Sequence, residues 1–158
     1  VNFNELILLE SIGKQAFYYS GIIDLLTVPS SLTSIVDQAF RQCYGLTSVI
    51  FESGSQLETI GVWMFRKSGL SGSITLPASV TSIGNSAFYE CSRLTNVNFE
   101  PNSQLTTIGI NAFQSSGISG SISFPASRTS IEASSFRSCS SLTSESFERG
   151  RELGKLGT

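Results

Sequence analysis

The chain has 158 residues, a formal net charge of −2 and only 14% charged residues, while 30 serines and 12 threonines supply most of its polarity. A pI near 5.1 provides no basic field, so the composition argues against a nucleic-acid or anionic-membrane partner. Histidine is absent, which excludes His-based triads, histidine general bases and histidine-ligated metal sites. The apolar runs are too short to span a bilayer, so we expect no membrane insertion.

In chain order, one repeat unit returns six times, and the interval between units alternates between about 23 and about 25 residues. Each unit opens with an extended segment that ends in isoleucine, passes through a bend resembling Gly-x-x-Ala-Phe, and closes with a short segment of alternating apolar residues. The bend is predicted to be a turn of α- or 3₁₀-helix. We expect the opening segments at 9–12, 32–35, 57–60, 80–83, 105–108 and 128–131, and strands at 26–28, 49–51, 74–76, 97–99, 122–124 and 145–147.

All eleven phenylalanines fall into two columns, which are equivalent positions in successive repeats. Six form the first column, in the bends, and five form the second column, at the ends of the closing segments. A unit of this size cannot bury its own apolar side, whereas stacked units bury a continuous core. The predicted fold is therefore a repeat solenoid of about six coils, built mostly from short parallel β-strands. It spans residues 1–148, with a partial coil at 1–8 and six repeats from residue 9, and a charged tail at 149–158 lies outside the repeat.

The repeat consensus resembles the BspA-like class of leucine-rich repeats, found in surface proteins of bacteria and parasitic protists. The match is carried by residues 32–35, 39–43 and 46–51, and again from Val80 to Phe99. The resemblance implies a right-handed leucine-rich-repeat superhelix. It also implies a cell-surface or secreted location and a role in adhesion or recognition of a protein or glycan.

The two ends of the repeat depart from the pattern. The chain opens inside a unit, without a visible polar cap, and at the other end Arg128, Glu132 and Glu145 replace the usual residues. The late charges could blunt an exposed edge, or the array could simply end there. The open coil could instead stack on further repeats or on another copy, which makes a structural protein that assembles end to end the alternative function.

Reactive side chains recur in the repeat, but none suggests catalysis. Cys43, Cys91 and Cys139 recur at every second unit, which places them two coils or about 10 Å from one another. A disulfide needs Cα atoms within about 7 Å, so we expect buried free thiols. The recurring carboxylates Glu52, Glu100 and Glu148 are interpreted as acids on a solvated edge rather than as a hydrolase pair. We therefore predict no enzyme activity, no cofactor and no metal.

One outward column differs chemically from the rest. The residue after the first-column phenylalanine is often tyrosine or arginine, residue types enriched in binding hot spots. In the third unit a tryptophan replaces a small polar residue beside Arg66 and Lys67, and we expect it to face solvent. The hypothesis is a recognition patch, and the alternative is that the tryptophan only covers Met64. The patch comprises Tyr18, Arg41, Trp63, Arg66, Tyr89 and Arg137, with Gln114 in the same column.

The outward residues of the predicted strands form a second exposed surface. They are mostly serine, threonine and asparagine, so the face is flat, uncharged and rich in hydroxyl and amide groups. Such a face could bind a glycan or a protein weakly. An inert soluble surface is the favoured interpretation.

Overall fold

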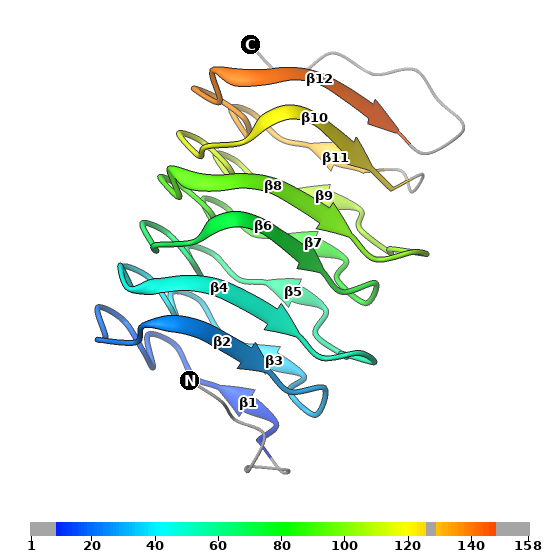
Figure 1. Ribbon diagram of the computed structural model, residues 1–158. Helices are drawn as coiled ribbons and strands as arrows, with labels where there is room; N and C mark the ends of the chain where they lie inside the picture. The colour runs from blue at the N-terminus through cyan, green and yellow to red at the C-terminus, as the bar shows by residue number, and fades with distance from the viewer. Residues whose placement is uncertain (1–8, 126–128, 148–158) are drawn as a thin grey trace.

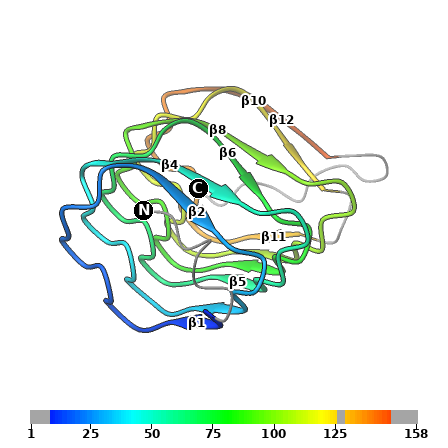
Figure 2. The same ribbon diagram turned by 60° about the horizontal axis from the view of Figure 1, so that its bottom comes forward.

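The computed structural model describes residues 9–125 and 129–147 and shows one solenoid, in which each repeat forms one coil (Figure 1). Every coil contributes a two-residue strand and a longer strand, and the two lie on opposite sides of the stack (Figure 2). The predicted solenoid is thus confirmed. The short strands are β1 (Ser11–Ile12), β3 (Ser34–Ile35), β5 (Thr59–Ile60), β7 (Ser82–Ile83), β9 (Thr107–Ile108) and β11 (Ser130–Ile131). The long strands are β2 (Asp24–Val28), β4 (Leu46–Phe51), β6 (Ser71–Leu76), β8 (Arg93–Phe99), β10 (Ser119–Phe124) and β12 (Ser141–Phe147).

The long strands pair in parallel two by two, as β2–β4, β6–β8 and β10–β12. Each pair joins two coils that are separated by the shorter repeat interval, for example through Ile74 and Val97. Between pairs the repeat interval is the longer one, and there the described strands form no ladder. The alternation of the two intervals therefore divides this side of the solenoid into three separate ribbons.

Each ribbon contains a bulge at the same place. In β6–β8 the register shifts between Gly72 and Ser73. Gly72 has φ of +67°, a conformation that glycine adopts without steric cost. The Thr95 hydroxyl donates to the Gly72 carbonyl oxygen (3.0 Å), so the recurring threonine closes the bulge.

The expected helical turn is wrong for the described residues, which contain no helix. Each bend is a series of tight turns in which two non-glycine residues, such as Gln15 and Tyr19, have φ between 54° and 63°. Because of these left-handed residues, every second N–H points along the solenoid axis. Phe17 N donates to the Ala39 carbonyl oxygen of the next coil (2.9 Å), while Tyr18 N donates within its own coil (2.9 Å). A helix would direct these N–H groups along its own axis and leave neighbouring coils unbonded.

The core is a ladder of phenylalanine rings. Five successive pairs, running from Phe17 to Phe136, stack with centroids 5.0 to 5.7 Å apart and interplanar angles of 19° or less. The four central rings are fully buried. Identical rings on successive coils fit the coil spacing, and this fit explains why the phenylalanine column is uninterrupted.

Several expectations concern residues outside those described. They are the partial coil at 1–8, Arg128, Glu148 and the tail at 149–158. Within the described part of the chain, no helix is long and apolar enough to cross a membrane.

Candidate functional site

The candidate column forms a continuous stack of alternating rings and cations, which we call the arginine–aromatic stack; Tyr18 is exposed and the other members are half-buried. It comprises Tyr18, Arg41, Trp63, Arg66 and Tyr89, drawn from four successive coils. The Arg41 guanidinium carbon lies 5.4 Å from the centroid of Tyr18 and 4.9 Å from that of Trp63. Arg66 lies 5.5 Å from Trp63 and 5.0 Å from Tyr89. Each arginine is therefore held between two aromatic rings.

The backbone explains how a tryptophan from a different sequence column joins this stack. Trp63 precedes the buried Phe65 by two residues, whereas Arg41 and Arg66 each follow a phenylalanine directly. At φ of +56° the Trp63 backbone is left-handed, and its N–H donates to the Asn85 carbonyl oxygen of the next coil (3.1 Å). Its ring lies between the two guanidinium groups. Trp63 is half-buried, so the expectation of a solvent-facing side chain is only partly met.

The hydrogen bonds around the stack use few of the arginine donors. Arg41 Nη1 donates to Gln38 Oε1 (2.8 Å), which also accepts from Gln15 Nε2 (3.1 Å). Arg41 Nε is buried and has no hydrogen-bond partner. Among the described residues, the ion pair joins Lys67 to Glu90 (3.2 Å), and neither stack arginine has a carboxylate within ion-pair distance. The stack therefore presents two positive charges that no acid of the described chain neutralises.

Three exposed side chains that the sequence reasoning missed extend the stack at one end. Tyr19, Ile23 and Tyr44 are 68%, 65% and 55% exposed. The Tyr19 ring lies 6.4 Å from Tyr18 and packs edge-on against Tyr44 at 6.0 Å. We call these three residues the apolar knob. Its signal in the sequence is a tyrosine pair, Tyr18–Tyr19, where later coils have a polar residue in the second position.

Arg137, also predicted for the patch, stands apart from the stack. Gln114 occupies the intervening coil, and Arg137 is exposed on the last described turn segment. The structure thus brings together five of the six candidate residues.

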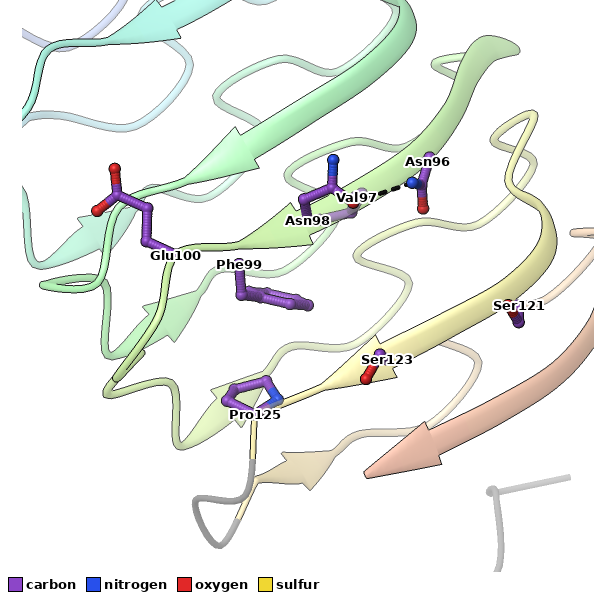
Figure 3. Close-up of a pocket in the computed structure, with 8 residues that line it drawn as sticks. All are labelled: Asn96, Val97, Asn98, Phe99, Glu100, Ser121, Ser123 and Pro125. Atoms are coloured by element: carbon purple, nitrogen blue, oxygen red, sulfur yellow. Dashed lines mark hydrogen bonds between the residues drawn. The ribbon is translucent and has the colours of Figure 1, made fainter. Parts of the chain in front are cut away.

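The polar sheet face has a shallow hollow of about 220 Å³ where β8 and β10 separate (Figure 3). Its lining includes Asn96, Asn98, Phe99 and Ser123. Asn96 Nδ2 donates to Asn98 Oδ1 (3.0 Å), so these amides partly satisfy each other. The N-terminal end of this face is less polar than the rest, because Leu25 and Ile50 are exposed there.

The reactive residues have structural roles. All three cysteines are free and buried, and burial raises the pKa of the Cys91 thiol to about 11. Cys91 Sγ donates to the Phe65 carbonyl oxygen (3.0 Å). Glu52 and Glu100 accept hydrogen bonds from backbone N–H groups of the preceding coil, at 3.2 and 3.0 Å. No group of three potential metal ligands occurs among the described residues.

A family model described as a BspA type leucine-rich repeat region matches residues 10–143 in six copies. The chain belongs to this family. The six copies agree in number with the six coils of the solenoid.

Two solved structures of bacterial proteins resemble the BspA-type chain. The pneumococcal vaccine antigen PcpA is 30% identical, with a TM-score of 0.76 over 89% of this chain. A leucine-rich cell surface protein of Faecalibacterium prausnitzii shares the fold at 22% identity, with a TM-score of 0.60 over 87% of this chain. The chain spans only 36% and 42% of the lengths of these two proteins. The comparison with curated proteins finds no match.

Proposed function

We propose that this protein is a non-catalytic binding module that recognises a partner protein at a cell surface or outside the cell. The observation that carries the proposal is the arginine–aromatic stack, in which five outward side chains from four coils contact one another in alternation. Tyrosine, tryptophan and arginine dominate binding hot spots because they combine a large contact area with directed polar groups.

The solenoid supports recognition by holding this surface rigid before a partner arrives. Each stack residue lies within two positions of a phenylalanine of the core ladder, in a turn segment that is hydrogen bonded to the neighbouring coil. Ring contacts on both sides further restrict the rotamers of Arg41 and Arg66. Side chains ordered in advance lose less conformational entropy on binding, so more of the contact energy contributes to affinity.

The proposed location rests on the relatives. One structural neighbour is described as a cell surface protein and another as a vaccine antigen. Both names suit an outward-facing repeat scaffold. The chain would then present its stack to molecules outside the cell, and the proposal includes no catalytic step.

Selection from a random peptide library tests the proposal even though the partner is unidentified. The immobilised wild-type chain is panned, and enriched peptides are then measured against Trp63→Ala. The matched control is Ser123→Ala, a change on the polar sheet face. We expect the enriched peptides to lose at least tenfold in affinity for Trp63→Ala and to bind the control like wild type. Peptides that bind all three chains equally would show that the stack is not the recognition surface.

The second candidate function is end-to-end assembly, favoured by the direction of the inter-coil hydrogen bonds. In the turn segments of the first five coils the alternate N–H groups donate toward the following coil, as Phe65 N does to the Ala87 carbonyl oxygen (2.8 Å) and Phe88 N to that of Ala112 (2.7 Å). Head-to-tail contacts between copies form open filaments when the rotation from one copy to the next does not close into a ring. Sedimentation velocity over a hundredfold concentration range tests this function. A sedimentation coefficient that grows continuously with concentration supports assembly. A constant coefficient that corresponds to the 17.0 kDa monomer rules out assembly of this chain by itself.

A further inference from the structure

We infer that the arginine–aromatic stack binds an extended acidic segment of a partner protein, with two carboxylates on alternate residues followed by apolar side chains. This inference rests on the proposed function and names the chemistry of its partner. Four observations carry it: the covered faces of the arginines, their missing acids, the charge of the turn segments and the neighbouring apolar knob.

The ring contacts determine which part of each arginine can bind. Rings lie against Arg41 from Tyr18 and Trp63, and against Arg66 from Trp63 and Tyr89. The N–H groups of a guanidinium lie at its edges, and their fork geometry matches the two oxygens of a carboxylate. An anion that approaches from solvent therefore meets an arginine that the rings already hold in place.

The stack arginines also lack the acids that would make them structural. The ion pair found in the described chain uses Lys67 and Glu90 instead. The nearby Asp37 accepts the N–H of Val62 through Oδ1 (2.9 Å) and is thereby committed to the backbone. Because the rings displace water from the guanidinium groups, an incoming carboxylate is screened less than it would be at an open surface.

The charge of the turn segments points to an acidic partner. The whole chain has a net charge of −2, yet among the described residues most lysines and arginines lie in these segments. Lys14, Arg41, Arg66, Lys67 and Arg137 are found there, and Arg93 is the described cation outside them. The same segments carry two acids, Asp37 and Glu90, so they keep an excess of positive charge. A local positive field on an acidic protein accelerates association with negatively charged ligands.

The apolar knob favours apolar residues in the part of the partner segment that follows the two carboxylates. Tyr19 and Tyr44 continue the stack from Tyr18. Ile23 lies against Gly45, the residue after Tyr44, since its Cγ2 is the atom that a Cβ on Gly45 would meet at 2.8 Å. In an extended peptide, alternate side chains share one face and lie about 6.6 Å apart. The Arg41 and Arg66 guanidinium carbons lie 4.9 and 5.5 Å from the Trp63 centroid, so they are at most about 10 Å apart. The flexible side chains of two glutamates on alternate residues can span this separation and face both arginines, while the next residues reach the knob.

Paired synthetic peptides test the inference. The probe is a fluorescein-labelled decapeptide with two glutamates on alternate positions followed by leucine and phenylalanine, and its partner has glutamine in place of both glutamates. Fluorescence anisotropy in 50 mM salt should show at least tenfold tighter binding of the glutamate peptide to the wild-type chain. We expect this preference to shrink in 300 mM salt because the charges are screened.

Three variants separate charge from apolar contact. The double variant Arg41→Gln with Arg66→Gln should reduce the preference for glutamate to less than threefold. Arg93→Gln, which removes an exposed cation outside the stack, should retain it. Tyr44→Ala should weaken both peptides by a similar factor, because the knob contacts the apolar residues that the two peptides share. Circular dichroism confirms that each variant is folded.

Several results would overturn the inference. They are equal affinity for the two peptides, no binding of the glutamate peptide at 1 mM, or an unchanged preference in the double variant. Tighter binding of a sulfated heparin oligosaccharide through the same arginines would replace the acidic segment by a glycan. If panned peptides depend on Trp63 but show no preference for carboxylates, only the inference fails. If they ignore Trp63, the proposed function fails as well.

Discussion

Replacing Ser115 by glycine should stabilise this protein, although glycine destabilises an ordinary helix or strand. Ser115 lies in a turn segment at φ of +57°, and its N–H donates to the Arg137 carbonyl oxygen of the next coil (2.9 Å). A serine has a steric cost at positive φ that glycine does not have.

The size of the effect is a difference between two terms. The left-handed conformation costs a non-glycine residue about 1–2 kcal/mol. Glycine adds about 0.4–1 kcal/mol of conformational entropy to the unfolded chain, which offsets part of the gain. We therefore expect Ser115→Gly to raise the free energy of unfolding by about 0.5–1 kcal/mol. Ser115→Val should lower it by more than about 1 kcal/mol, because a β-branched side chain fits this conformation worst.

Urea denaturation measures these changes, with the fluorescence of the single tryptophan, Trp63, as the signal. The control is Ser123→Gly in β10, where the backbone is extended and glycine should cost about 0.5–1 kcal/mol. The reasoning is refuted if Ser115→Gly destabilises the protein as much as Ser123→Gly does. That result would mean that the segment is helical after all.

Three further predictions concern the core and the coil contacts. Phe88 is fully buried and stacked on both sides, so Phe88→Ala should cost about 4 kcal/mol; the half-buried Phe136, changed to alanine in parallel urea titrations, should cost clearly less. Burial raises the pKa of the Cys91 thiol to about 11, whereas an unfolded cysteine ionises near pH 8.5. The free energy of unfolding should therefore fall as pH rises from about 8.5 toward 11. Urea unfolding at pH 8 and pH 10 measures this fall, which should be smaller in Cys91→Ala. An equal fall in the variant and the wild-type chain contradicts the prediction. Asp37→Ala should cost about 1.5–3 kcal/mol through the lost bond to Val62 N, while Asp37→Asn, which keeps an acceptor, should lose less than half of that in thermal melts.

Much of the fold could be predicted because the same sequence pattern recurs in six units. A phenylalanine that returns at every coil must stack on its counterparts, and the rings from Phe17 to Phe136 do so. The free thiols followed from their spacing in the same way. The prediction of helical bends was wrong because the residue types at these positions, such as Lys67, do not indicate a positive φ. The bonds to the next coil, rather than local preference, hold these residues there.

The candidate site was predictable as a column but not as an arrangement. The residue after each phenylalanine points outward whatever its type, so Tyr18, Arg41, Arg66 and Tyr89 could be grouped from the sequence alone. The knob formed by Tyr19, Ile23 and Tyr44 was missed because its members come from different columns and meet only where two coils pack side by side.

The sequence by itself therefore determined the number of coils, the core ladders and the outward columns, because these depend only on which residues recur at the repeat period. The tertiary structure decided how the strands divide into ribbons and how the bends turn. It also placed Trp63 between two arginines that precede and follow it in the chain. These features depend on backbone hydrogen bonds and ring contacts between neighbouring coils, which exist only once the coils are stacked.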